Sequence, residues 1–225
     1  MMQPRTRSKW TPTAALGTAL ALTIAIALAP RATRAAETPR TVVQVKAQKV
    51  VEILNSGASD DEKIRRLEEV AYATIDFDTV CRLVLAKNWK KFTPEQRQQF
   101  QGEFKRAFTV SYGRRIGQFG QEKVIIHGER QEPLGDATVQ SHIVGGKAGD
   151  MKVDYRLRQK GGTWYMIDVI VEGVSIVSSY RTQFQEVLGQ GGPEQLLAQL
   201  RQKNESVEGL APAENTAKKG MSTAR

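Results

Sequence analysis

The chain has 225 residues, of which 40% are hydrophobic and 25% are charged, a composition that suits one globular domain. Its formal net charge is +9, but five of its 33 Lys and Arg residues lie in the first 36 positions, where no acidic residue occurs. The remaining chain carries 28 basic against 24 acidic groups, and no Lys- and Arg-rich block interleaves with aromatic residues. The sequence therefore argues against a nucleic-acid partner.

The N-terminus has the layout of a secretory signal peptide. Three basic residues precede an uncharged stretch rich in Ala and Leu at 14–29, and small residues follow at Ala35 and Ala36. The stretch is shorter than the ~20 residues that a membrane-spanning helix needs, so we expect residues 1–36 to be removed by cleavage after Ala35 or Ala36. No cysteine follows it to carry a lipid anchor, which predicts a soluble product in the exported compartment.

The chain has a single cysteine, Cys81, and this excludes an internal disulfide. Val80, Leu83 and Val84 surround it at helical spacing, so a buried packing role is favoured over a reactive thiol. The fold must therefore be stable through its hydrophobic core alone.

The first half of the exported chain has the pattern of helices. Apolar residues at helical spacing predict one helix that ends at the turn residues 55–57. A capping box at 59–62 opens a second helix, and residues 78–85 form a short third one. Pro94 marks the start of a long helix in which an apolar, mostly aromatic residue recurs every three or four positions: Phe100, Phe104, Phe108, Tyr112, Ile116 and Phe119.

After Gly120 the hydrophobic period changes from helical to alternating. Between positions 151 and 158, the odd-numbered residues are apolar or aromatic and the even-numbered ones are charged. One face of this strand is therefore buried and the other is exposed to solvent, as in an antiparallel sheet. Turns rich in Gly separate the strands, which are predicted at 124–130, 137–144, 151–160 and 163–171.

The stretch 164–184 is the most informative part of the chain. A run of β-branched and aromatic residues predicts a strand that stops at Glu172 and Gly173 and passes directly into an amphipathic helix. The helical pattern ends at Gly189, and a second helix begins at Pro193.

The predicted elements form a single domain at residues 37–203, followed by a disordered tail at 204–225 that is poor in apolar residues. Helices follow one another in the first half, and strands follow in the second. This order predicts an α+β fold in which helices pack on one face of a twisted four-stranded antiparallel sheet.

Residues for chemistry are few. His127 and His142 are the only histidines, and neither has a second ligand nearby in sequence, so no metal and no other cofactor is expected. Asp168, inside an apolar strand, and Glu172 are the best candidates for catalysis, because burial could raise the pKa of such a carboxylate. The alternative, which we favour, is that both accept backbone N–H groups and hold the turn from strand to helix.

The motif W…D…EGVS…YR..F at 164–184 resembles the MlaC family, the toluene-tolerance type of periplasmic phospholipid carriers. The likeness extends from about Val45 to Lys203. Its other pieces, individually weaker, occur in the same order and spacing: Trp89, residues 93–97, Phe100, Phe104, Tyr112 and residues 133–136.

The resemblance implies an NTF2-like, cone-shaped fold whose apolar cavity, between the helices and the sheet, holds the acyl chains of a phospholipid. It further implies a periplasmic, non-enzymatic monomer. Such a carrier docks transiently on two membrane complexes, an inner-membrane complex of an MCE protein with an ABC permease and an outer-membrane lipoprotein complex. Basic side chains near the mouth, such as Arg82, Lys87 and Arg181, could meet a phosphate group.

Apolar side chains on the two facing layers are the candidates to line this cavity, and composition alone does not distinguish a cavity from a solid core. The rival interpretations are a carrier of a hopanoid or other polycyclic lipid, an enzyme that uses Asp168 as a base, and an interaction protein with a closed core. The candidate ligand-binding residues are Val80, Leu83, Val84, Phe104, Phe108, Tyr112, Val139, Tyr155, Leu157, Trp164, Met166, Val171 and Val174.

Overall fold

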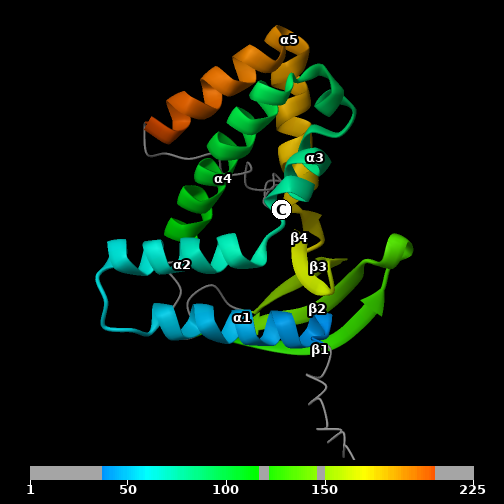
Figure 1. Cartoon of the computed structure of the whole chain (residues 1–225). Helices are drawn as coiled ribbons and strands as arrows, with labels where there is room; N and C mark the ends of the chain where they lie inside the picture. Colours follow the sequence, from blue (N-terminus) through cyan, green and yellow to red (C-terminus); the bar gives the residue numbers. More distant parts are fainter. Residues whose placement is uncertain (1–36, 117–121, 146–149, 206–225) are drawn as a thin grey trace, which may run out of the picture. The chain divides into compact units, whose positions relative to one another are not determined.

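The computed structural model describes residues 37–116, 122–145 and 150–205 (Figure 1). By its contacts the chain divides into Met1–Ala35 and Ala36–Arg225, and all the described residues belong to the second unit.

Several predictions concern residues outside this description. The signal peptide at 1–36, Phe119 and the tail beyond Glu205 are outside the described residues. Tyr112 lies in a helix by its backbone, but its side chain, like those of Val110 and residues 113–116, is outside the described part.

Helices form the first half of the described chain, as predicted. Their bounds follow the expected patterns, and a short 3-10 helix that the sequence did not predict joins the third to the fourth. The elements are α1 (Pro39–Leu54), α2 (Asp60–Thr74), α3 (Phe77–Leu85), η1 (Ala86–Lys91) and α4 (Pro94–Ile116).

Polar side chains cap the helices at the predicted starts. At α2, the Ser59 hydroxyl accepts from Glu62 N at 3.4 Å, but the Glu62 carboxylate accepts from two arginines instead of completing the capping box. At α4 the box is complete: Thr93 Oγ1 accepts from Gln96 N at 3.2 Å, and Gln96 Oε1 accepts from Thr93 N at 2.9 Å. Each cap satisfies backbone groups that a helix end leaves unpaired.

The second half of the domain is an antiparallel sheet with the strand order β1-β2-β3-β4-β5. It confirms the α+β class, but the sheet has five strands and not the predicted four. Three strands have the predicted bounds, the first is one residue longer at each end, and the fifth is new: β1 (Lys123–Gln131), β2 (Ala137–Val144), β3 (Met151–Lys160), β4 (Thr163–Val171) and β5 (Val174–Ser175).

The prediction that β4 passes directly into a helix is wrong, because the chain first turns back on itself. Glu172 and Gly173 have φ values of 49° and 81°, so both central residues of this two-residue connection are left-handed. That geometry joins antiparallel strands, and Val174 pairs with Val171 as β5. The last helix, α5 (Ile176–Glu205), begins only after this hairpin.

The predicted stop at Gly189 is also wrong, since α5 continues through that glycine. The helix breaks instead at Gly192, with φ 69° and ψ −165°, immediately before the predicted start at Pro193. Asn204, the first residue of the predicted tail, is still helical and buried at 4% exposure. It is held because its side-chain amide donates to the Glu103 carbonyl oxygen at 3.0 Å.

A shift of register in β4 decides which residues face the helices. Leu157 pairs with Met166, whereas Arg156 pairs with Asp168, so Ile167 is an extra residue in β4. This bulge places Met166 on the same face as Leu157 and turns Asp168 to the opposite face with Arg156.

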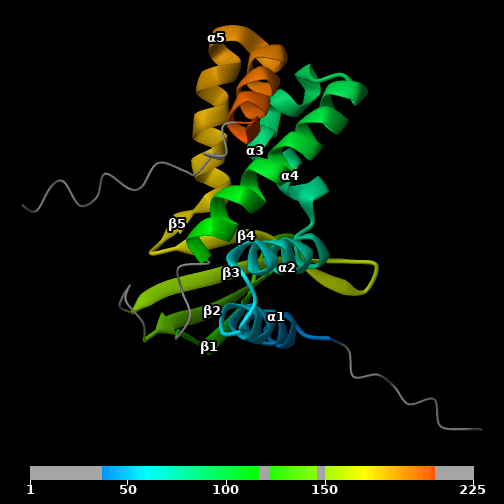
Figure 2. The same ribbon diagram turned by 90° about the vertical axis from the view of Figure 1, so that its left-hand side faces the viewer.

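Buried apolar side chains form two main clusters. The helical core unites α3, α4 and α5, with Phe104, Tyr180 and Phe184 among its buried members. The sheet core joins α1 to the inner face of the sheet, with Val43 and Leu157 fully buried. Figure 2 shows α1 along β1 and β2, beside the sheet, while α3, α4 and α5 gather on the other side of β4. The two cores meet at β4.

Candidate functional site

A small apolar pocket lies where the helical core meets β4. Its volume is about 20 Å³, room for about one water molecule. Its lining surface is apolar, although Asp168 and Tyr180 are among the lining residues. The lining residues are Ile75, Phe77, Val80, Phe104, Phe108, Met166, Ile167, Asp168, Val169, Ile176, Val177 and Tyr180.

The wall on the helical side of this pocket is closely packed. Phe104 stacks on Phe100 with ring centroids 5.6 Å apart, and it meets the Tyr180 ring edge-on at 5.0 Å. Phe104 and Tyr180 are fully buried. The helical wall of the pocket is therefore densely packed and leaves little room for a further group.

Four of the candidate ligand-binding residues line the pocket, namely Val80, Phe104, Phe108 and Met166. The other candidates whose side chains the structure describes divide among neighbouring places. Leu83 and Val84 belong to the helical core, and the β4–β5 hairpin holds the half-buried Val171 and Val174. The sheet core contains Val139, Tyr155, Leu157 and Trp164.

The sequence did not identify several lining residues. Ile167 and Val169 were missed because the bulge in β4 cannot be predicted from an alternating pattern. Ile75 comes to the site through a bridge to Met166, where Asp76 N donates to the Met166 carbonyl oxygen at 3.0 Å. Tyr180 had a visible signal, since it belongs to the apolar stripe of the helix after Glu172.

Asp168 caps α5 from the neighbouring strand. Its carboxylate accepts from Val177 N at 3.1 Å and from the Ser175 hydroxyl, and Ser175 Oγ in turn accepts from Ser178 N at 3.0 Å. Burial raises the pKa of Asp168, while the hydrogen bonds from Ser175 and Val177 oppose this rise. Both acceptor positions are thus used to hold the start of the helix, as the favoured interpretation predicted.

Glu172 has an equally local set of bonds. Its carboxylate accepts from Lys152 N, and its own N–H donates to the Lys152 carbonyl oxygen at 2.9 Å. These contacts attach the β4–β5 turn to β3. Glu172, like Asp168, accepts a backbone N–H group.

Other groups that could carry chemistry lie apart from the pocket. His127 and His142 meet on neighbouring strands with their Nδ1 atoms 3.3 Å apart, a pairing that the sequence did not predict. No cluster of three or more potential metal ligands occurs among the described residues. Cys81 is fully buried in the helical core, and burial raises the pKa of its thiol.

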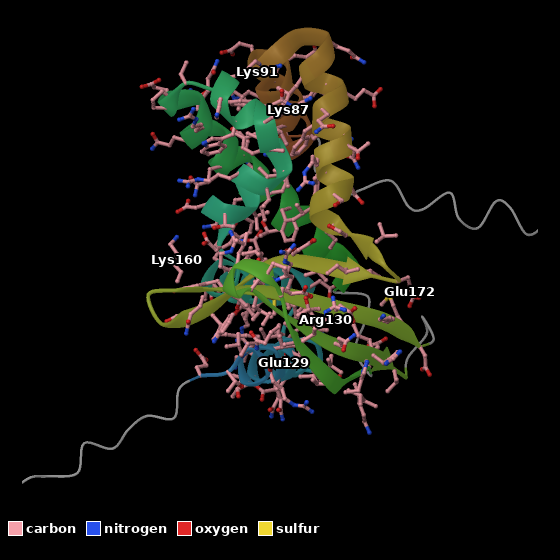
Figure 3. All side chains as sticks on the ribbon, turned by 90° about the vertical axis from the view of Figure 1, so that its right-hand side faces the viewer. Lys87, Lys91, Glu129, Arg130, Lys160 and Glu172 are labelled. Carbon is pink, nitrogen blue, oxygen red and sulfur yellow. The ribbon has the colours of Figure 1, made fainter. Side chains whose placement is uncertain are left out.

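The basic side chains expected near the mouth do not line this pocket. Arg82 lies over the Trp89 ring, 5.6 Å from its centroid, and Arg181 Nε donates to the Leu83 carbonyl oxygen at 2.8 Å. Lys87 lies on η1, at the end of the helices away from the sheet (Figure 3).

In the part of the chain that the structure describes, no helix combines the length and apolar character needed to cross a bilayer.

A second, larger pocket lies between the two arms of α5. Its volume is about 310 Å³, but glutamine and charged side chains supply much of its lining, including Gln183, Glu186 and Gln199. By size alone, this second pocket would be the better candidate for a ligand-binding site. The small pocket at β4 is the better candidate for an apolar ligand because of its lining and because two separately packed cores meet there.

These features define an α+β domain with an apolar pocket between a helical core and the inner face of an antiparallel sheet. The chain belongs to the MlaC family, because the family model described as "MlaC protein" matches residues 44–202. A toluene tolerance protein, ttg2D, from Pseudomonas putida is 29% identical over 181 residues, which cover 76% of this chain and 82% of that protein.

A solved structure supports the fold. It is the phospholipid-binding protein from Ralstonia solanacearum in complex with a phospholipid, which aligns with a TM-score of 0.67. The alignment covers 76% of this chain and 98% of that one at 21% identity. At this identity, the likeness establishes the shared fold.

Proposed function

We propose that this protein is a non-enzymatic periplasmic carrier that binds a phospholipid between the helical core and the sheet. The observation that carries the proposal is the apolar pocket at β4, in a fold shared with a protein solved with a phospholipid. Membership of the MlaC family supports the same function. The signal peptide predicted at 1–36 supports the periplasmic location.

The magnitude of the hydrophobic effect explains why such a carrier needs an apolar interior. Each methylene group shielded from water is worth ~0.8 kcal/mol, so two long acyl chains exposed to water would cost on the order of 20 kcal/mol. The carrier must nearly match the shielding of the bilayer to extract a lipid. Much better shielding would prevent its release.

The pocket of about 20 Å³ is too small for an acyl chain, so lipid binding in this proposal requires the helical core and the sheet to separate. Separation of the layers would break the hydrogen bond from Asp76 N to the Met166 carbonyl oxygen and the ion pairs of Lys160. Lys160 Nζ lies 3.4 Å from a carboxylate oxygen of Asp76 and 3.8 Å from one of Asp78, and its side chain is 60% exposed. The pair with Asp78, whose side chain is 55% exposed, is exposed on both sides and contributes roughly 1 kcal/mol or less.

The continuous chain at the β4–β5 hairpin would act as the pivot. Asp168 binds the first turn of α5 to β4, so this corner stays intact when the layers part. Acyl chains would then enter beside Phe108 of α4 and Met166 of β4, which both line the pocket.

We further propose that the carrier takes lipid from, or gives it to, an inner-membrane complex of an MCE protein with an ABC permease. An outer-membrane lipoprotein complex would be the other terminus. Membership of the MlaC family supports the proposal of both partners. No covalent step occurs in such a shuttle, so it needs no catalytic group.

Mass spectrometry of an organic extract tests the proposal directly. Protein purified from the periplasm without detergent is expected to carry phospholipid in at least a substantial fraction of molecules. A hopanoid in the extract would support the rival cargo. Protein that carries no lipid, and that takes up none from phosphatidylglycerol and phosphatidylethanolamine vesicles, would contradict the carrier function and favour the closed-core interaction protein.

A further inference from the structure

Leu134 combines an exposed side chain with an unfavourable backbone. It is 90% exposed, more than any other large apolar residue that the structure describes as exposed. It lies at the tip of the β1–β2 hairpin, in the short 3-10 turn η2 (Pro133–Gly135), with φ 65° and ψ 18°. This is the left-handed region, which bulky side chains rarely adopt.

The turn itself requires this backbone. Leu134 and the following Gly135 both have positive φ, and Asp136 N donates to the Pro133 carbonyl oxygen at 3.5 Å. This is the pattern of a type I′ turn, whose first central position favours Asn, Asp or Gly. A leucine at this position works against the turn, and it buries almost none of its surface in its own chain.

The surrounding residues hold the strained tip in place. Glu132 N donates to the Asp136 carbonyl oxygen at 2.8 Å. The Asp136 side chain is fully buried, and its carboxylate accepts from Arg156 at 3.0 Å and from Arg158 at 2.7 and 2.8 Å. The Glu132 carboxylate accepts from Thr138 at 2.7 Å. Bonds from β2 and β3 therefore hold the base of the turn that carries Leu134.

A strained residue that is held firmly and contacts little within its own chain points to a role outside that chain. We propose that Leu134 is an anchor that inserts into an apolar socket on a protein of the inner membrane, with which the carrier exchanges lipid. This inference rests on the proposed carrier function for its setting.

The size of one leucine favours a protein socket over the bilayer. A whole myristoyl chain gives only marginal, reversible binding to a membrane, and a leucine side chain is far smaller. The other large apolar residues described as exposed, Val45, Tyr72 and Ile125, lie on α1, α2 and β1, outside this turn. A single rigid apolar knob suits a preformed concave pocket.

Charges beside the anchor indicate the rim of that socket. Arg130 and Arg156 remain 64% and 40% exposed although each bonds to an acid at the base of the turn. Figure 3 shows Arg130 on the sheet, apart from Lys87 and Lys91 on the helices. An apolar socket with acidic groups at its rim would complement this surface in shape and in charge.

Two substitutions at position 134 distinguish the effect of the apolar side chain from the effect of the turn conformation. Leu134→Asn suits the left-handed backbone and removes the apolar knob, so the domain should stay folded with an unchanged or higher melting temperature. Leu134→Met is the matched control, because it keeps the apolar volume on the same backbone.

Each protein is loaded with isotope-labelled phosphatidylglycerol and mixed with one of two acceptors. The first acceptor is inner-membrane vesicles with their proteins, and the second is liposomes made from lipids extracted from those vesicles. We expect Leu134→Asn to slow transfer to the vesicles about tenfold or more, because a buried leucine contributes at least that factor to binding. Leu134→Met should stay within about threefold, and all three proteins should transfer equally to the liposomes.

Equal rates to the native vesicles for all three proteins would overturn the proposal. Slower transfer by Leu134→Asn to both acceptors would also overturn it, since the side chain would then act on lipid release or on the bilayer. Cosedimentation of unloaded protein with the same two acceptors needs no cargo. It therefore tests the anchor even if wild-type protein takes up no phosphatidylglycerol, the result that would contradict the carrier function itself.

Discussion

Met166 contacts both the sheet core and the residues at the start of the helical core. It packs on the sheet core, lines the pocket, and accepts a hydrogen bond from Asp76 N through its carbonyl oxygen. The bulge at Ile167 keeps it on the inner face beside Leu157. A change at this side chain therefore acts on the boundary without removing a fully buried residue from either core.

Replacing Met166 with Glu is expected to remove bound lipid. A carboxylate in this apolar pocket would have to lose its water when acyl chains enter. The free-energy cost of that desolvation is far larger than the free energy that its contacts with the acyl chains could contribute. We expect the phospholipid that copurifies to fall at least tenfold, measured by mass spectrometry of extracts, while far-UV circular dichroism stays that of wild type.

Ile125→Glu supplies the matched control, because Ile125 is apolar but 51% exposed on β1. Its lipid content should equal that of wild type. Folded Met166→Glu protein with a wild-type content of lipid would show that the acyl chains lie elsewhere.

Asp168 allows a prediction about pH. Because burial raises its pKa above the usual 3.8, its ionisation destabilises the folded state relative to the unfolded chain. That destabilisation is absent below the unfolded-state value and appears as the pH rises through the folded-state value. The free energy of unfolding of wild type minus that of Asp168→Asn should therefore be larger at pH 4 than at pH 7.

Urea denaturation of both proteins at the two pH values measures this difference. A difference that is independent of pH, or that changes in the opposite direction, would mean that the hydrogen bonds from Ser175 and Val177 outweigh burial. The same variant tests the enzyme interpretation, because an enzyme that used Asp168 as a base would lose turnover while remaining folded.

Among the elements, the β4–β5 hairpin depends most clearly on backbone conformation. Gly173 has φ 81° and open space where a Cβ would be placed, so substitution there meets backbone strain and no clash. Gly189 lies inside α5 with equal space but without a positive φ. The two glycines therefore isolate the effect of conformation.

Alanine at these positions should have opposite effects. We expect Gly173→Ala to destabilise the domain by about 1 kcal/mol, because the left-handed region disfavours a side chain. Gly189→Ala should stabilise it by roughly 0.5–1 kcal/mol, because alanine is the better helix former. Thermal unfolding of both variants beside wild type provides the measurement, and shifts of the same sign would contradict the hairpin geometry.

These two glycines also show how far the elements could be predicted. The bounds of β2, β3 and β4 were predicted correctly, because alternation and Gly-rich turns are local signals. Gly189 resembled a helix end, but packing of Leu188 and Leu196 into the helical core carries the helix past it. The strand β5 has only two residues and is held by pairing with β4, which no local pattern reveals.

The site was less predictable than the fold for the same reason. Phe104, Phe108 and Val80 belong to helical stripes that the sequence displays, and they do line the pocket. The sheet side depends on the bulge at Ile167 and on the bridge from Ile75 to Met166. Both are tertiary features, and they decide which neighbouring side chains face the helices.

At the scale of the whole domain, bound lipid would raise the stability of the folded protein. A ligand that binds the folded state and not the unfolded chain stabilises it according to its concentration and affinity. Lipid-loaded protein should therefore melt about 5 °C or more above delipidated protein. This shift is expected when the effective lipid concentration is ~100 times the dissociation constant.

Differential scanning calorimetry of the two preparations, at equal protein concentration, gives this shift. Reloading the delipidated protein from phosphatidylglycerol vesicles should restore the higher melting temperature. Identical melting temperatures for protein that demonstrably contains lipid would place the lipid on the surface and not between the layers.

Cys81 offers a view of motion that requires no engineered label. It is the only cysteine of the chain, and the helical core covers it completely. Alkylation by a maleimide can therefore occur only when that cluster opens by itself. If cargo enters by moving the helices as one rigid body, the alkylation rate will be the same for full and empty protein, whereas entry that loosens the helices from one another would change it.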